Sequence, residues 1–398
     1  MQNQVDYYRS RGYFTVFVCV PIHCSYVADH PDWPELKAGM NELGADRIYF
    51  ATIDNWKFTT AKYTAWVRQS FRGTALDWII LTAKSAQLPP EALAFLRSAD
   101  VSLIHVNHVF TLGFARYLQN KVVRSGRQLP LIIDTHDIQA SALEDRHEIN
   151  PWTHRYDSLE RLERSEIAHL KSADVMVHLS VDDLRFFQER FPQKAHVLAM
   201  PTIDQAFVSM VERTEPRADD PIDILFVGQS TTPNTAAIQW FFEKVWPLIA
   251  DRGYRLKVVG GISTAIREKL PAIYAAFASY FVGPTATADL APFYASARCV
   301  IAPMISGTGV SIKTIEALAL GKPFVGTSKA YRGMPTGRLE SAGLRAYDTP
   351  ESFADAIVQA LHDGQAAAAA SRSAYAALFS QQAAFAARDN ALQAAVIR

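Results

Sequence analysis

The sequence predicts an α/β protein built from two Rossmann-like domains. Strand-sized apolar runs alternate with amphipathic stretches of helical length along most of the 398 residues, which is the pattern of parallel βαβ units. The apolar runs are nearly continuous, as expected for strands that helices cover on both faces. A polar segment with prolines at 201–221 separates two such series and indicates a linker between domains.

The first series predicts an N-terminal domain over residues 1–210. A Rossmann-like domain normally opens with a strand and a glycine-rich turn, but this sequence opens with a helix-like stretch at 4–11, which Gly12 ends as a C-cap. The usual first strand, which is central in such a sheet, is therefore missing from the pattern. Either the chain starts upstream or another segment takes the place of that strand. The strands expected in this domain are 14–20, 47–51, 102–105, 131–134, 175–179 and 196–200.

The second series predicts a C-terminal domain over residues 211–365. The alternative, one large sheet through the whole chain, is disfavoured because open sheets beyond ~10 strands are uncommon. The alanine-rich tail at 366–398 predicts one or two helices packed outside the core, since alanine is the best helix former. The strands expected in this domain are 222–227, 255–259, 279–282, 299–302 and 323–326.

Composition and charge narrow the class of protein. Apolar residues make up 49% of the chain and charged residues 20%, which suffices for a core in each half. The 40 basic and 40 acidic side chains cancel, which disfavours a nucleic-acid-binding protein because such proteins usually carry a basic excess. No apolar run approaches the ~20 residues of a membrane span. The polar start at 1–11 lacks the apolar core of a signal peptide, so a cytoplasmic protein is expected.

Cysteine and histidine patterns predict no metal site. The three cysteines are widely spaced and form no C-x-x-C pair, so neither a disulfide framework nor a structural zinc site is expected. His105, His108 and His136 follow predicted strands, but no acidic or cysteine ligand accompanies them at a fixed spacing.

One loop between a predicted strand and helix carries the clearest chemical signal. Gly307, Thr308 and Gly309 precede the helix, where glycines let the backbone approach a ligand and free N–H groups attract a phosphate. Lys313 adds a positive charge in the first turn. Glu316 lies on the same helix face, and its carboxylate can accept hydrogen bonds from the vicinal hydroxyls of a ribose. A Lys–Glu surface pair at a helix start is the alternative without a ligand.

Two further glycine junctions are expected at the same edge of the C-terminal sheet. The strand at 222–227 runs into Gly228, and a helix is predicted after Asn234 as N-cap. The strand at 255–259 runs into the glycine pair 260–261. Ligands of open α/β sheets bind outside the carboxyl ends of the strands, so the three loops together predict one binding edge.

In the order and spacing of these segments, the C-terminal half resembles glycosyltransferases of the GT-B fold, and family 4 of the retaining enzymes most closely. The resemblance implies two Rossmann-like domains facing across a cleft, with a nucleotide diphosphate sugar on the C-terminal domain and the acceptor on the N-terminal one. It implies transfer of a sugar to a glycan or lipid-linked acceptor, commonly in cell-surface polysaccharide synthesis, with no metal or other cofactor. The matching segments are 224–234, 258–261, 282–283 with 289–290, 303–309 and 313–325.

The resemblance also assigns roles to individual residues. The second glutamate of the family's E-x7-E motif falls on Glu316, which would hold the ribose, whereas the first falls on Thr308. The Arg and Lys that many members carry in the first loop fall on Gln229 and about Thr235. The sequence is more similar to a sub-branch in which loop amides and Lys313 hold the pyrophosphate. The predicted donor-binding residues are Gly228, Asn234, Gly307, Thr308, Gly309, Val310, Lys313 and Glu316.

The predicted catalytic residues are His136, Asp137 and Lys313. The resemblance places His136 where family members have a histidine near the donor sugar, and Asp137 follows it directly. Positioning and polarisation are expected of this pair rather than full general-base work, because the leaving phosphate can take the acceptor's proton. Without the resemblance, a strand-end histidine capped by an aspartate is the favoured alternative.

The stretch 101–133 contains basic and aromatic residues but no acidic one. Such a stretch can rest on an anionic membrane surface, which would suit a lipid-linked acceptor and the inner face of the membrane. A solvated helix face is the more common interpretation of the same pattern, and both stay open here.

Two other functions remain open at this point. One is a non-catalytic nucleotide-sugar-binding protein or partner subunit, and the other is a nucleotide-sugar epimerase with the GT-B fold.

Overall fold

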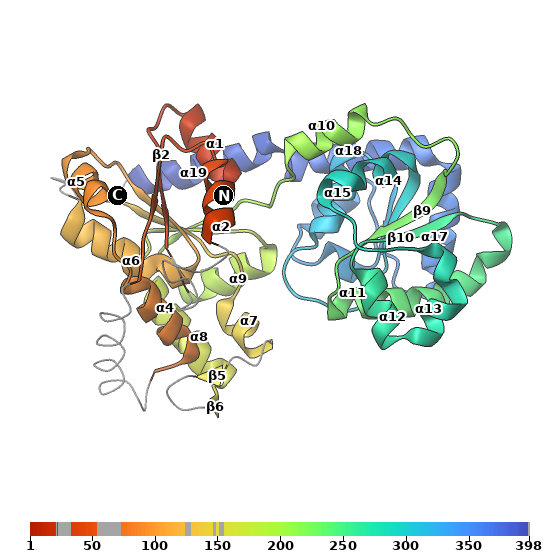
Figure 1. The fold of residues 1–398 in the computed structure, drawn as a ribbon, viewed down its shortest axis with the longest axis horizontal. Helices are drawn as coiled ribbons and strands as arrows, with labels where there is room; N and C mark the ends of the chain where they lie inside the picture. The colour runs from red at the N-terminus through yellow and green to blue at the C-terminus, as the bar shows by residue number, and fades with distance from the viewer. Residues whose placement is uncertain are drawn as a thin grey trace. The chain divides into compact units, whose positions relative to one another are not determined.

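The chain forms two compact units in which parallel strands alternate with helices (Figure 1). The first unit holds Met1–Ala199 together with Phe385–Arg398, and the second holds Met200–Ala384. The predicted α/β class with parallel sheets is confirmed. The computed structural model describes residues 1–20, 22, 33–53, 73–123, 129–145, 149–150 and 155–396.

The first unit contains a parallel sheet in the order β3-β4-β7-β8, a separate parallel pair β1-β2 and a short antiparallel pair β5-β6. The central strands β4 and β7 are fully buried. The strands are β1 (Val16–Cys19), β2 (Arg47–Phe50), β3 (Ile104–Asn107), β4 (Leu131–Asp134), β5 (Ile149–Asn150), β6 (Arg155–Tyr156), β7 (Val175–His178) and β8 (Ala195–Leu198). The helices are α1 (Gln2–Ser10), α2 (Trp33–Asn41), α4 (Ala75–Lys84), α5 (Pro90–Ser98), α6 (Leu112–Tyr117), α7 (Gln139–Asp145), α8 (Leu159–Leu170) and α9 (Val181–Arg190).

The second unit is a single five-stranded parallel sheet in the order β11-β10-β9-β12-β13. Its first strand is central, which is the Rossmann arrangement. The strands are β9 (Ile222–Val227), β10 (Leu256–Val259), β11 (Phe281–Val282), β12 (Ala297–Ala302) and β13 (Phe324–Gly326). Helix α19 (Gln381–Val396) begins in this unit and continues into the first. The other helices are α10 (Gln205–Arg213), α11 (Thr232–Trp240), α12 (Ile262–Lys269), α13 (Pro271–Phe277), α14 (Ala291–Ser296), α15 (Ile312–Ala319), α16 (Thr336–Ser341), α17 (Pro350–His362) and α18 (Gly364–Leu378).

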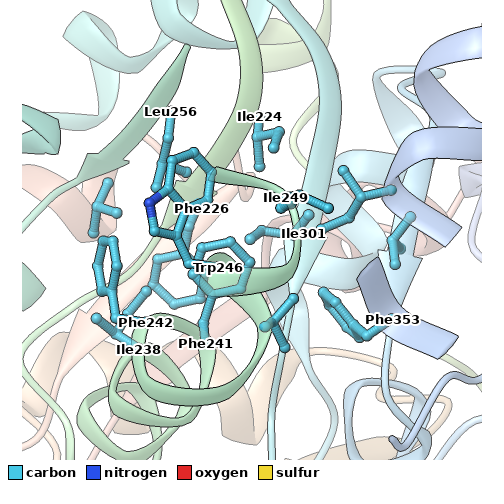
Figure 2. Packing of buried hydrophobic residues seen from close by; sticks show 14 of the residues in the cluster. Ile224, Phe226, Ile238, Phe241, Phe242, Trp246, Ile249, Leu256, Ile301 and Phe353 are labelled. Carbon is cyan, nitrogen blue, oxygen red and sulfur yellow. The ribbon is translucent and has the colours of Figure 1, made fainter. Parts of the chain in front are cut away.

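Aromatic side chains fill the core of the second unit on one face of its sheet (Figure 2). Phe226 of β9 is fully buried there, and the ring centroids of Phe241 and Trp246 in the same cluster lie 6.0 Å apart (Figure 2). Phe242 stacks on Phe277 with ring centroids 4.3 Å apart. Because large aromatic residues contribute the most apolar area per side chain, this cluster fixes β9 and the loop that follows it.

The division between the units lies after Ala199, whereas the sequence predicted a boundary after residue 210. The predicted linker contains helix α10, which buries Phe207 and Val211. The ring of Phe207 meets the ring of Tyr294 edge-on, with centroids 6.0 Å apart. Apolar residues four apart mark a helix face, and the surrounding prolines and charges obscured this signal in the sequence.

The alanine-rich tail, predicted over 366–398, forms two helices that are divided between the units. Helix α18 packs against α15 in the second unit, where Ser371 donates a hydrogen bond of 2.7 Å to the carbonyl of Lys322. In the first unit, α19 lies beside α1 (Figure 1), and Tyr7 donates a 2.8 Å hydrogen bond to Asp389.

The basic stretch 101–133 is less exposed than expected for a membrane-binding surface. Phe110, Leu112 and Phe114 are buried in the core of the first unit. The amphipathic pattern therefore marks a core-facing helix, and Tyr117 is the large apolar residue that it exposes. None of the described helices is long and apolar enough to cross a membrane.

A buried ion pair ties α19 to the end of β4. The guanidinium of Arg388 lies 2.9 Å from the carboxylate of Asp134, and the ring of His105 lies 2.7 Å from the same carboxylate. Burial opposes ionisation, yet the charges of Arg388 and His105 hold the pKa of Asp134 well below its usual range. Gln4 of α1 also donates to Asp134, so one carboxylate joins both terminal helices to the sheet.

Replacing Arg388 with methionine is expected to lower the opening free energy of β4 by about 3–5 kcal/mol, because it removes the guanidinium that balances the charge of a buried carboxylate. Native-state hydrogen exchange of the β4 amides measures that free energy. The matched control is Arg11→Met, which removes the exposed ion pair with Asp389 and should cost less than about 1 kcal/mol. Equal losses in the two variants would contradict the role given to Asp134.

Candidate active site

Two loops leave adjacent strands at the point where the strand order of the second unit reverses. Strands β9 and β12 pair in parallel, with Ile224 opposite Cys299, and their carboxyl ends lie at one edge. At such a switch point the loops diverge to opposite faces and leave a crevice for a ligand. The loop after β9 begins at Gly228, and the loop after β12 contains Gly307 and Gly309.

The neighbouring loop after β10 is held against the first by a glycine. Gly260 has a φ of +107°, and a Cβ there would lie 2.5 Å from the carbonyl oxygen of Gly228. That carbonyl accepts a hydrogen bond of 3.1 Å from the amide of Ile262. The close packing of the two loops therefore requires glycine at position 260.

Asn234 lies inside helix α11, so its prediction as the N-cap is wrong. The helix begins at Thr232 and Thr231 is the N-cap, because Pro233 suits the first turn, where no N–H is needed. The side chain of Asn234 instead donates a 2.8 Å hydrogen bond to the carbonyl of Gln229. Its amide oxygen is left to accept from Lys313.

Lys313, in the first turn of α15, is held by neutral partners. Its ammonium donates to Asn234, lies 3.8 Å from the sulfur of Met304 and sits 4.4 Å from the ring centroid of Phe226. Burial, with a contribution from the charge of Arg332, lowers the pKa of Lys313 to about 7. No ion pair links it to Glu316, so the surface-pair alternative does not describe these residues.

Arg332 belongs to the same site, although the sequence reading did not select it. It follows a 3₁₀ turn (Ser328–Tyr331) after β13. Its Nε donates a 3.1 Å hydrogen bond to the carbonyl of Thr308, and its Nη1 donates to that of Lys329 at 2.9 Å. The signal available in the sequence was an arginine just past a predicted strand at the same sheet edge.

The loop before α15 has the backbone of a ligand-approaching turn. Gly307 and Gly309 have φ values of +118° and +64°, which side-chain-bearing residues rarely adopt. A Cβ on Gly307 would lie 3.4 Å from both Arg332 and Pro233. Thr308 is exposed and Val310 is half-buried. The loop therefore brings the predicted residues 307–310 next to the helices that carry Asn234 and Lys313.

Glu316 lies one turn further along α15 and has a partner that sequence reasoning missed. The buried Tyr294 of α14 donates a 3.1 Å hydrogen bond to its Oε2. Burial raises the pKa of Glu316, while the bond from Tyr294 and the charge of Lys313 oppose that rise. Tyr294 thus orients the carboxylate and leaves its other oxygen to accept further hydrogen bonds.

In the first unit, His136 lies at the carboxyl end of β4 in a strained conformation. His136 and His108 are the described non-glycine residues with positive φ, at +61° and +67°, and such strain concentrates at functional sites. Their rings stack with centroids 4.1 Å apart, and His136 Nε2 lies 3.0 Å from Oδ1 of Asn107. Burial lowers the pKa of His136, so its ring is neutral at pH 7. Asp137 is exposed.

Among the described residues, no group of His, Cys, Asp or Glu is arranged to hold a metal ion. His105 forms hydrogen bonds with Asp134 and with the hydroxyl of Tyr8.

Comparison with known proteins identifies the second unit. Residues 221–363 match the family model described as glycosyl transferases group 1. The second unit resembles a group 1 glycosyltransferase domain over this range. The match spans every strand of its sheet, both glycine loops and the residues Asn234, Lys313 and Glu316. The prediction of a glycosyltransferase is therefore confirmed, and membership of family 4 stays a prediction.

Solved glycosyltransferase structures show the GT-B fold across the whole chain. HepE of Anabaena, solved with UDP, aligns with a TM-score of 0.60 and 13% identity over 98% of this chain and 96% of HepE. A trehalose 6-phosphate synthase from Burkholderia multivorans aligns with a TM-score of 0.59 and 13% identity. The alignment covers 89% of this chain and 86% of the synthase. A glycosyltransferase from Rickettsia africae aligns with a TM-score of 0.56 and 12% identity. The alignment covers 99% of this chain and 93% of that protein. A search of curated proteins found no match.

Proposed function

We propose that this glycosyltransferase moves a sugar from a nucleotide diphosphate sugar to a glycan or lipid-linked acceptor, with retention of the anomeric configuration. The carrying observation is a pair of cations, Lys313 and Arg332, beside the glycine loop at the start of α15. In the described part of the chain, neither of them forms an ion pair with a carboxylate. Holding two cations partly away from water costs desolvation free energy, and an anion bound at this loop offsets that cost by pairing with them.

A diphosphate has the charge and size that this arrangement favours. The amides of 307–310 and the start of α15 supply N–H donors, while Lys313 and Arg332 supply two positive charges. Asn234 fixes the ammonium of Lys313 in the loop. These groups are in place before the reaction, so they can stabilise the charge that develops on the departing diphosphate without reorganising.

The ribose of the donor is assigned to Glu316. A carboxylate oriented by Tyr294 can accept hydrogen bonds from both vicinal hydroxyls, and bonds to a charged acceptor are the strong kind. HepE, the structural neighbour described above, was solved with UDP and with UDP and glucose, which supports a uridine or related nucleotide for this chain as well.

In the transfer step, the bond between the sugar's anomeric carbon and the diphosphate oxygen breaks, and the acceptor oxygen bonds to the same face of the sugar. The acceptor's proton passes to the departing phosphate oxygen. His136, neutral at pH 7 and fixed by Asn107, positions the donor sugar by hydrogen bonding, and Asp137 polarises the acceptor. No metal ion or other cofactor takes part, and the chain works in the cytoplasm, in cell-surface polysaccharide synthesis.

Turnover separates this proposal from its alternatives. With UDP-, GDP- and ADP-sugars, we expect release of nucleoside diphosphate that rises several-fold when a glycan or lipid-linked acceptor is added, and a product with the donor's anomeric configuration by NMR. A binding protein would release no diphosphate under any condition. An epimerase would change the donor sugar in the absence of an acceptor.

Nucleoside diphosphate binding is expected to weaken as the pH rises above about 7. Lys313 has its pKa lowered to about 7 in the free protein, and a bound diphosphate raises it, so binding takes up a proton above that pH. The dissociation constant then rises by about tenfold per pH unit until the pKa of the bound form is reached. Calorimetry between about pH 7 and 9, where the second phosphate ionisation near pH 6 is complete, measures the effect.

The matched control for this pH dependence is Lys313→Arg, which stays charged throughout the range and should bind with little pH dependence. An equal slope in the wild type and the arginine variant would show that Lys313 is not the titrating group.

A further inference from the structure

The first unit contains an apolar cavity of about 920 Å³ between strands β1 and β3. We call it the slot and define it by its walls, Val16–Cys19 of β1 and Ile104–Asn107 of β3. Helix α1 lines it through Val5 and Tyr8, and α6 lines it through Phe114. The slot is therefore bounded by two strand edges and by helices, which are the surroundings of a central strand in a doubly covered sheet.

Among the residues that the structure describes, no strand pairs with the main-chain groups of β1 that face the slot. The carbonyls of Thr15 and Cys19 accept from the amides of Arg47 and Ala51 at 3.1 and 2.9 Å, so these residues face β2. Main-chain groups of successive strand residues point to opposite sides, and Val16 and Val18 therefore direct theirs into the slot.

The edge of β3 shows the same pattern from the other side. The amides of Ile104 and His108 donate to β4 and the residues flanking it, at 3.0 and 3.1 Å. His105 and Asn107 therefore direct their main-chain groups into the slot. No hydrogen bond links the described residues of β1 with those of β3. Both strands are only half-buried for most of their length, unlike β4 and β7.

Two facing rows of free N–H and C=O groups select the kind of occupant. Buried main-chain groups are almost always paired, and only an extended polypeptide offers donors and acceptors on both of its sides at the strand repeat. A small apolar ligand would fill the volume but would leave both rows unpaired.

The second unit of the same chain shows what the completed arrangement looks like. There the first strand, β9, lies centrally between β10 and β12. A strand in the slot would give the first unit the order β2-β1-slot strand-β3-β4-β7-β8, which is the same arrangement with the first strand in the centre.

The position of α1 identifies the source of that strand. Gln4 donates a 2.8 Å hydrogen bond to Asn107, the last residue of β3, so α1 starts at the edge where parallel strands end. Met1 itself lines the slot, and burial lowers the pKa of its amino group. A strand ending there leads directly into α1 and then into β1, which forms a βαβ unit.

We propose that the slot is occupied by a further parallel β-strand, supplied by polypeptide that precedes Met1 in the same chain. The strand is apolar on both faces, because helices cover both faces of the slot. It is about four to six residues long, as its neighbours are, and it ends in a tight turn next to Met1.

The test compares the chain beginning at Met1 with a longer chain that carries the residues its own gene encodes in frame ahead of Met1. Hydrogen exchange followed by mass spectrometry is read on peptides covering 16–20 and 103–107. In the longer chain we expect exchange at these peptides to slow by about tenfold or more, because amides paired in a central strand exchange only on larger openings. The peptide covering β9 should be unchanged.

A proline placed in the middle of the added strand is the matched control, since proline cannot donate to the ladder; it should restore fast exchange. A gene with a stop codon directly ahead of Met1, or equal exchange in the longer and shorter chains, would overturn the proposal. Protection in the shorter chain that grows with protein concentration would identify a second copy as the occupant and also overturn it. The proposal would also be overturned if calorimetry showed that the shorter chain binds dodecanoate and that the longer chain binds it equally well. The slot would then still be open to a small apolar ligand in the longer chain.

Discussion

Replacing Lys313 with alanine is expected to lower kcat by about 100- to 1000-fold, with a smaller effect on the affinity for nucleoside diphosphate. The ammonium lies in the first turn of α15, next to the loop that would bind the diphosphate, and Asn234 fixes it there. Negative charge on the bridging oxygen grows as the sugar departs, so the interaction is stronger in the transition state than in the bound donor. Steady-state kinetics with the donor sugar, together with calorimetric binding of the diphosphate, separates the two effects.

Two variants make this prediction specific. Lys313→Arg keeps the charge and should retain most of the activity that alanine loses, while Lys269→Ala removes an exposed lysine at the end of α12 and should have no effect. A kcat for Lys313→Ala within about threefold of wild type, a difference of only about 0.7 kcal/mol, would exclude Lys313 from the chemistry.

Replacing Glu316 with alanine is expected to weaken nucleoside diphosphate binding by about 10- to 100-fold, because hydrogen bonds to a charged acceptor contribute about 1.5–3 kcal/mol. The effect should appear in binding and in KM, since the ribose contacts are the same in the ground state and the transition state. Isothermal titration with the preferred diphosphate measures it. Glu340→Ala, which removes an exposed glutamate on α16, is the matched control.

Deoxyribose ligands assign the lost contact to the ribose. The wild type should bind the 2′- or 3′-deoxy analogue of the diphosphate more weakly than the parent, and Glu316→Ala should bind all of them alike, because the carboxylate that distinguishes them is gone. If the variant still discriminates as strongly as the wild type, then another residue holds the ribose.

Much of the fold could be predicted from the sequence because buried parallel strands carry a strong signal. The runs at 131–134 and 175–179 match β4 and β7 within one residue, and both strands are buried throughout. Helix α10 was missed because prolines and charges surround a short apolar face. The burial of the apolar side chains at 101–133 could not be predicted, because periodicity shows that a helix has an apolar side but not what that side contacts.

The candidate site was predicted in part, because glycines and a lysine at a helix start follow a known physical logic. The structure brings Lys313, Asn234 and the loop at 307–310 together. Arg332 and Tyr294 could not be selected in the same way, since their roles depend on which strands become neighbours. The missing first strand was visible in the sequence as a gap in the βα alternation, and it corresponds to the slot between β1 and β3.

The central claim is that the second unit binds a nucleoside diphosphate through Lys313 and Glu316. Its most direct test is thermal unfolding of the wild type, Glu316→Ala and Glu340→Ala with UDP, GDP, ADP and CMP. At about 100 times the wild-type dissociation constant, one diphosphate should stabilise the wild type and Glu340→Ala by about 2.7 kcal/mol, and a variant with 100-fold weaker binding by about 0.4 kcal/mol. Equal stabilisation of all three proteins, or none by any of the nucleotides, would contradict the claim.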